Sequence, residues 1–205
     1  RRSPATSRCT RAWRTGKLSK AVLVVDVQND FVDGSLGTAR GVEVARGISS
    51  FLSDADMGDN TYVVGTMDWH IDPKGHFSDE PDYVDTWPVH CVANSHGAQV
   101  CSELDADLVQ VWFRKGEYTA AYSGFEGHLE GASDTLEQWL RSREVEKLTV
   151  VGIATDFCVR ATVLDALKAG FEVRVIERLC SAVTEQGGKS AIQEMEDAGA
   201  EIVRG

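Results

Sequence analysis

The sequence predicts an α/β fold, a single three-layer α/β/α domain around a mainly parallel, six-stranded sheet. Three observations support this fold class. Short β-branched segments alternate with helix-like segments from residue 20 onward, as in β-α-β units. Several strand segments are apolar at consecutive positions, which is typical of strands covered on both faces. A chain of 205 residues that is 42% hydrophobic is sufficient for one such core.

Each predicted element follows from its local pattern of apolar residues. The strands are expected at residues 21–27, 61–67, 108–113, 148–153, 171–176 and 200–203. The helices are expected near residues 41–54, 98–105, 134–142, 157–169 and 188–198. Asp134 and Glu137 have the spacing of a capping box at the start of the third helix. Gly170 and Gly199 follow the last two helices, where helix C-termini favour glycine.

The chain is acidic, with a net charge of −11. The first 20 residues hold seven bases and no acid, which leaves 14 bases against 32 acids in the rest. This balance argues against a nucleic-acid partner, whose phosphates require a basic surface. Residues 1–19 lack hydrophobic periodicity and are interpreted as a disordered basic extension, such as a tag, start-site or transit-like remnant. Residues 20–205 are expected to form the domain.

The apolar segments and the cysteines indicate the compartment. No segment approaches the about 20 apolar residues of a membrane span, so no membrane partner is expected. The cysteines have no C-x-x-C spacing and are interpreted as free thiols of a reducing compartment, the cytoplasm. They are Cys9, Cys91, Cys101, Cys158 and Cys180. The oligomeric state stays open, with a homo-oligomer as one alternative.

Reactive side chains follow four of the predicted strands. Asp26 ends the first strand, Asp68 and His70 end the second, Lys115 follows the third and Cys158 follows the fourth. Ligands of parallel α/β sheets bind beyond the carboxyl ends of the strands, so these side chains are expected to meet at one edge.

Cys158 is the candidate nucleophile. It is expected in the first turn of a helix, where the dipole lowers the pKa of a thiol and backbone N–H groups can hold an oxyanion. Asp26 and Lys115 would then act with it, as a base and a stabilising cation. The alternatives are a buried structural cysteine, a loop-capping aspartate and a solvated surface lysine.

A cluster of histidines with one acid suggests a metal site. Asp68, His70, His76 and His90 fall within 23 positions, and imidazole with carboxylate suits Zn²⁺, Fe²⁺ or Mn²⁺. The alternative is a set of polar loop histidines, since this spacing matches no common metal motif. One divalent metal ion is therefore a candidate cofactor.

Five sequence blocks, in this order, resemble the nicotinamidase/pyrazinamidase family of isochorismatase-like cysteine hydrolases. The resemblance covers about residues 20–205 and implies an isochorismatase-like fold of Rossmann-like topology. The blocks are VVDVQNDF, DWHIDPKGHFSDEPDY, WPVHC, RKGEYTAAYSGFEG and VVGIATDFCVRAT.

The resemblance implies roles for particular residues. It implies a catalytic triad of Asp26, Lys115 and Cys158. It also implies an oxyanion hole at the N–H groups of Ala154 and Cys158, after a cis Ile153–Ala154 peptide. The implied metal ligands, with water completing six-coordination, are Asp68, His70, His76 and His90. The implied substrate-binding residues are Phe31, Leu36, Trp87, Tyr122, Ile153 and Phe157. Leu36 follows a loop one residue shorter than is frequent in the family, and Phe157 occupies a variable position.

The implied activity is hydrolysis of nicotinamide to nicotinate and ammonia through a thioester, in NAD salvage, with pyrazinamide as a second substrate. The resemblance also suggests that the metal binds the pyridine nitrogen, directly or through a bound water. The sequence also admits two other interpretations. One is a metal-free relative that acts on another amide, which would not need Asp68, His70, His76 and His90, or on a vinyl ether, which would not need Cys158. The other is a silent metal-binding or partner-binding module, which would have no need of Cys158.

Deleting residues 1–18 is expected to leave kcat and KM for nicotinamide essentially unchanged. The segment has no hydrophobic period and contains none of the residues in the five blocks. Steady-state kinetics of the truncated and full-length chains measure this, and a large loss of activity on truncation would contradict it.

Overall fold

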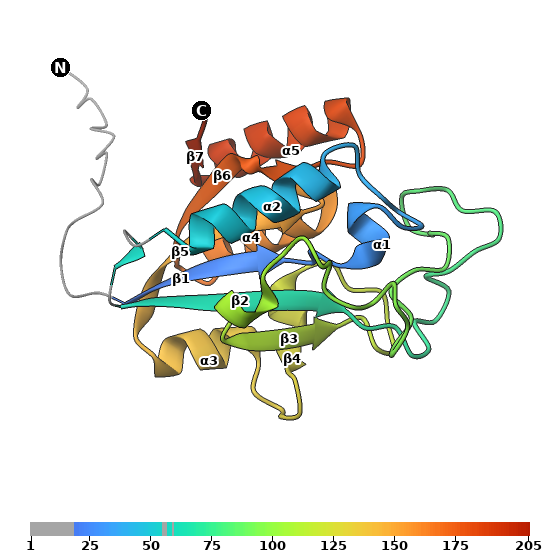
Figure 1. Cartoon of the computed structure of the whole chain (residues 1–205), viewed down its shortest axis with the longest axis horizontal. Helices are drawn as coiled ribbons and strands as arrows, with labels where there is room; N and C mark the ends of the chain where they lie inside the picture. Colours follow the sequence, from blue (N-terminus) through green and yellow to red (C-terminus); the bar gives the residue numbers. More distant parts are fainter. Residues whose placement is uncertain (1–18, 55–56, 59) are drawn as a thin grey trace, which may run out of the picture.

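A seven-stranded sheet runs through the centre of the molecule (Figure 1). Its strands are β1 Ser19–Val25, β2 Thr61–Asp68, β3 Val111–Lys115, β4 His128–Leu129, β5 Val145–Ile153, β6 Glu172–Ser181 and β7 Glu201–Val203. They lie in the order β4-β3-β2-β1-β5-β6-β7, and all neighbours are parallel except β3 and β4. This computed structural model describes residues 19–54, 57–58 and 60–205. The predicted extension thus lies outside the described residues, apart from Ser19.

The predicted α/β class and mainly parallel sheet are confirmed, with one strand more than the six expected. The additional strand, β4, has two residues, which are too few to produce a recognisable alternation in the sequence. The strand predicted at 108–113 begins later, because residues 106–108 form a turn of 3₁₀-helix before β3.

Four of the five predicted helices are present. The helices of the described chain are α1 Asn29–Val32, α2 Gly41–Leu52, α3 Leu136–Ser142, α4 Arg160–Lys168 and α5 Glu185–Ala198. The predicted helix at 157–169 is divided into a π-helical turn, Thr155–Val159, and α4. The prediction of a helix at 98–105 is wrong, because the backbone of this segment forms hydrogen bonds with the chain after β1. The Cys101 N–H donates to the Val27 carbonyl at 3.0 Å. Within the described residues, no helix is both long and apolar enough to cross a membrane.

The helix ends follow the expected chemistry with one shift. Thr135 and Gln138 form the capping box of α3, one position after the expected pair. Asp134 belongs to the preceding extended segment, where its carbonyl accepts a hydrogen bond from Leu129 at 2.8 Å. Gly199 caps α5 at φ 112° and Gly170 follows α4 at φ 89°, both in the left-handed region that favours glycine.

Each face of the sheet carries its own apolar core, which gives the three layers. One core joins the sheet to α3, α4 and α5, through residues such as Leu140, Val163 and Met195. The other joins the opposite face to α2 and to the long connection between β2 and β3, through residues such as Ile48 and Leu104. Strands covered on both faces account for the consecutive apolar positions in β1 and β5.

The strand order reverses between β1 and β5, which creates the crevice where such sheets bind ligands. Chain connections leave these two strands in opposite directions, toward β2 on one side and β6 on the other. Gly152 allows the close approach of β5 to β1, since a Cβ there would lie 2.2 Å from the Val25 carbonyl oxygen. Asp26 and the 155–159 turn thus enter the same crevice.

Candidate active site

Asp26 lies at the end of β1, in the left-handed region at φ 48°, and its side chain is fully buried. The Thr66 hydroxyl donates to Asp26 Oδ1 at 2.7 Å. Lys115 Nζ, from the end of β3, lies 2.9 Å from the second oxygen, Oδ2. One carboxylate oxygen is therefore held by β2, and the other is paired with a buried ammonium.

Lys115 is the centre of the cluster. Its Nζ also donates to Asp68 Oδ1, and lies 3.7 Å from Cys158 Sγ and 3.5 Å from the Ala121 carbonyl oxygen. Burial by itself would lower the pKa of this lysine, but Asp26 and Asp68 outweigh that effect and raise the pKa well above its ordinary value. Lys115 is therefore a fixed positive charge beside the thiol.

Cys158 lies in the π-helical turn Thr155–Val159, which follows β5 and begins the helical segment of α4. One oxygen of Asp26, one of Asp68 and the Cys158 sulfur lie within 4.8 Å of one another. Burial raises the pKa of the Cys158 thiol well above its usual value, although Lys115 opposes the shift. The expected lowering by the helix dipole is thus outweighed, because the residue is only 6% exposed.

The neighbouring carboxylate suits a proton acceptor. Burial raises the pKa of Asp26, with Lys115 acting against the shift and Asp68 adding to it. Burial by itself would also raise the pKa of Asp68. The interactions of Asp68 with Lys115 and His70 outweigh this effect and lower its pKa. Burial therefore makes the Cys158 thiol harder to ionise and Asp26 more basic, whereas the pKa of Asp68 lies below its ordinary value.

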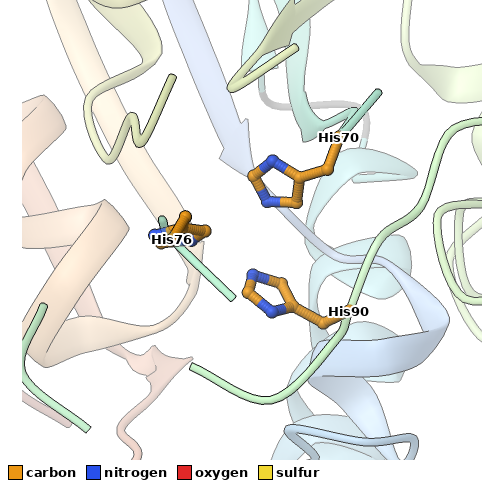
Figure 2. A group of neighbouring side chains, drawn as sticks. All are labelled: His70, His76 and His90. Atoms are coloured by element: carbon orange, nitrogen blue, oxygen red, sulfur yellow. The ribbon is translucent and has the colours of Figure 1, made fainter. Parts of the chain in front are cut away.

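Three buried imidazoles face a common space next to this cluster (Figure 2). One nitrogen from each of His70, His76 and His90 lies within 4.8 Å of the others. The Nδ1 atoms of His70 and His90 each contact a backbone carbonyl at 2.7 Å, of Gly116 and Pro88, which leaves their Nε2 atoms free. This arrangement orients histidines as metal ligands.

The chemistry of the donors fits a divalent metal. Two buried nitrogens, Nε2 of His70 and Nδ1 of His76, have no hydrogen-bond partner. Burial and the neighbouring imidazoles lower the pKa of His76 to about 4, so it carries a lone pair at neutral pH. Asp68 Oδ2 lies 3.5 Å from His70 Nε2 and 3.9 Å from His90 Nε2. The three predicted imidazole ligands therefore converge at one place, and the fourth predicted ligand, Asp68, adjoins two of them.

A pocket opens above the thiol and beside the imidazoles. The Trp87 Nε1–H donates to the Tyr122 hydroxyl at 3.0 Å, and both rings pack against Phe157, with centroids 4.8 and 6.2 Å away. The pocket residues are Phe31, Leu36, Thr38, Asp68, His76, Trp87, His90, Tyr122, Ala154, Phe157, Cys158 and Val183. Its walls are largely aromatic, and its floor is polar.

Most predicted substrate-binding residues line this pocket, and Ile153 does not. Ile153 is fully buried in the core, and the Ile153–Ala154 peptide is cis, as the resemblance implied. Thr38 and Val183 line the pocket but were not predicted, since neither lies in a reactive block. Thr66 was also missed, because no local pattern indicates which strand residue faces Asp26.

A buried glutamine completes the support of the site. Gln28 accepts the Asp68 N–H through Oε1 at 2.8 Å and donates through Nε2 to the carbonyls of Asp68 and Ala98, both at 2.8 Å. It thereby ties the chain after β1 to the end of β2. Its place in the DVQNDF block, two residues after Asp26, was the available sequence signal.

The isochorismatase domain family matches residues 20–205. The chain belongs to the isochorismatase family. This isochorismatase-family chain is 46% identical over 185 residues to a nicotinamidase/pyrazinamidase of Mycobacterium tuberculosis, covering 90% of this chain and 98% of the relative.

Solved structures of this family have the same fold. A pyrazinamidase of Pyrococcus horikoshii in complex with zinc is 33% identical with a TM-score of 0.75, covering 91% of this chain and 99% of that one. PnC1 from L. infantum in complex with nicotinate is 32% identical with a TM-score of 0.77, covering 91% and 93% of the two chains. The isochorismatase-like fold expected from the sequence is thereby confirmed.

Proposed function

We propose that this protein is a metal-dependent cysteine amidohydrolase that converts nicotinamide to nicotinate and ammonia, and pyrazinamide to pyrazinoate, in NAD salvage. The observation that carries the proposal is the buried cluster of Asp26, Lys115 and Cys158, whose cysteine lines an aromatic pocket. The similarity to a nicotinamidase/pyrazinamidase and to a family structure in complex with nicotinate supports this choice of substrate.

The first chemical step is formation of the thioester. Asp26 accepts the proton of the Cys158 thiol, and the sulfur attacks the carboxamide carbon to form a C–S bond. The N–H groups of Ala154 and Cys158 stabilise the negative charge that develops on the carboxamide oxygen. Asp26 then returns the proton to the departing nitrogen, so that the C–N bond breaks and ammonia leaves.

The second step is hydrolysis of that thioester. Asp26 accepts a proton from a water molecule, whose oxygen attacks the acyl carbon, and the C–S bond breaks. The proton returns to the sulfur and restores the thiol. Lys115 remains protonated throughout, because two carboxylates surround it, and it stabilises the negative charge on sulfur.

Four residues would hold the metal ion: Asp68, His70, His76 and His90. We infer a Zn²⁺, Fe²⁺ or Mn²⁺ ion, since all three accept nitrogen and carboxylate ligands, and a relative forms a complex with zinc. The bound ion would act as a Lewis acid that anchors the ring nitrogen of the substrate.

The pocket walls would hold the pyridine ring. Phe31 contacts His90 and Tyr122 contacts His76, while Phe157 packs against Trp87 and Tyr122, so all four rings supply aromatic surface to the pocket. Leu36 lies at the rim of the pocket, half-buried. A flat ring of pyridine size then has its ring nitrogen toward the histidines and its carboxamide over Cys158.

The direct test is product analysis with the purified metal-loaded protein. Nicotinamide is expected to yield nicotinate and ammonia in equal amounts, and pyrazinamide to yield pyrazinoate and ammonia. Chromatography quantifies the acids, and an enzyme-coupled assay quantifies ammonia. Failure to release ammonia from either amide, with the metal content confirmed, would contradict the proposed function.

A further inference from the structure

Asp156 is a buried carboxylate for which the proposed reaction has no use. It belongs to the π-helical turn Thr155–Val159, two positions before the nucleophile, and is 9% exposed. Its Oδ1 accepts the N–H of Val183 at 2.9 Å, and its Oδ2 accepts the N–H of Thr184 at 3.1 Å. One side chain therefore joins the turn after β5 to the chain after β6.

The site that receives this carboxylate has a shape suited to it. Thr184 is the N-cap of α5, and its hydroxyl accepts the Gly187 N–H at 3.0 Å. A Cβ at Gly187 would lie 2.5 Å from Asp156 Oδ2, so a glycine leaves the space that the carboxylate fills. The N-terminus of a helix also favours a negative charge. Asp156 thus bonds both N–H groups at the entry to α5.

The turn that carries Cys158 depends on such a link. Its N-cap position is Ala154, whose methyl group offers no side-chain cap. The N–H groups of Phe157 and Val159 both donate to the Ala154 carbonyl, at 3.1 and 3.0 Å, which holds the turn internally. These bonds do not connect the turn to the neighbouring elements, whereas the two bonds of Asp156 do.

Both ends of this link border the pocket. Val183 lines the pocket and is 42% exposed, so its backbone position helps to set one wall. Ala154 and Cys158 line it from the other end of the link. A displacement of the turn would move the sulfur relative to Lys115, which belongs to a different strand.

We propose that Asp156 is a positioning residue that holds the nucleophile and the oxyanion hole in register with Asp26 and Lys115 by fixing the 155–159 turn to the α5 N-terminus. It touches neither substrate nor reacting atoms. The proposal rests on the proposed amidohydrolase function. Misplacement of reacting groups by about 1 Å can cost about 100-fold in rate.

The test compares Asp156→Asn and Asp156→Ala with the wild type. Asparagine keeps one acceptor oxygen but turns an amide donor toward the second N–H group, whereas alanine removes both acceptors. We expect kcat for nicotinamide to fall about tenfold in Asp156→Asn and about 100-fold in Asp156→Ala. KM should change much less, since the aromatic walls and the metal ligands remain in place. An unchanged kcat per folded molecule in both variants would overturn the proposal.

Thr184→Ala is the matched control for stability. It removes the side-chain cap of α5 but keeps the Thr184 backbone N–H that Asp156 accepts. We expect it to lower the melting temperature with kcat unchanged, as the loss of a helix cap alone would. A loss of kcat as large as that of Asp156→Asn would mean that destabilisation of α5 explains the effect, and would overturn the positioning role.

Hydrogen exchange provides a measurement that needs no substrate. Peptides covering residues 154–160 should exchange their amide hydrogens faster in Asp156→Asn than in the wild type or Thr184→Ala. Unchanged exchange there would overturn the proposed link. If the wild type releases no ammonia from nicotinamide, the proposed function fails separately, and faster exchange would still support the link.

Discussion

Replacing Cys158 with alanine is expected to lower kcat/KM for nicotinamide by about 10⁴-fold or more, with the fold retained. The thiol forms the covalent bond to the acyl carbon, and loss of a nucleophile cannot be replaced by the rest of the site. Among the cysteines of the described chain, Cys158 is the one whose sulfur lies beside Asp26 and Lys115. Ammonia release, with circular dichroism as the measure of folding, checks this expectation.

Cys101→Ala is the control for this variant. Cys101 is also buried, but it packs in the core on the opposite face of the sheet, so its loss should leave activity close to that of the wild type. Because Cys158 lines the pocket, a thiol-alkylating reagent that enters the pocket should modify Cys158 before the other cysteines of the described chain and inactivate the enzyme in step with labelling. Substantial turnover by Cys158→Ala would contradict the covalent mechanism.

Benzamide is expected to be a poorer substrate than nicotinamide by about 10⁴-fold in kcat/KM, although the two amides have the same shape. In the proposed complex, nicotinamide is held at two points, its ring nitrogen at the metal and its carboxamide over Cys158. Benzamide fits between Phe31, Trp87 and Tyr122 but has no ring nitrogen. A site built around a polar contact rejects an analogue that lacks it, whereas shape alone separates isosteres poorly.

Pyrazinamide and metal removal complete this comparison. Pyrazinamide keeps a nitrogen at the same ring position and should remain a substrate. Chelation of the metal, or His70→Ala, should strongly lower kcat/KM for nicotinamide. Either change should also reduce the ratio of kcat/KM for nicotinamide to that for benzamide. Metal analysis of each sample establishes that the ion has been lost. Equal kcat/KM values for nicotinamide and benzamide with metal present would contradict the proposal that the metal anchors the ring nitrogen. The metal would then have a structural role.

The fold was largely predictable because its signals are local. Strands covered on both faces require consecutive apolar residues, so β1 and β5 were recognisable from their own sequences. The segment 98–105 shows the limit of such signals. Its pattern favours a helix, but the backbone bonds to the segment after β1, a partner about 70 positions away. Tertiary pairing overrides local preference in that segment.

The candidate site was predictable at the level of residue types and strand ends. Asp26, Asp68, Lys115 and Cys158 each follow a recognisable strand, and parallel strands bring their carboxyl ends to one edge. The individual roles stay predictions. The supporting roles of Thr66 and Asp156 could not be predicted, because these residues act through partners 40 and 27 to 28 positions away.

The sequence by itself therefore determined the α/β class, the family resemblance and the residues available at the sheet edge. Only the tertiary structure decided how those residues are charged and held. The pKa of the Cys158 thiol is raised rather than lowered, because burial outweighs the adjacent ammonium. Burial and long-range hydrogen bonds arise from the whole packed chain, so no local segment of the sequence specifies them.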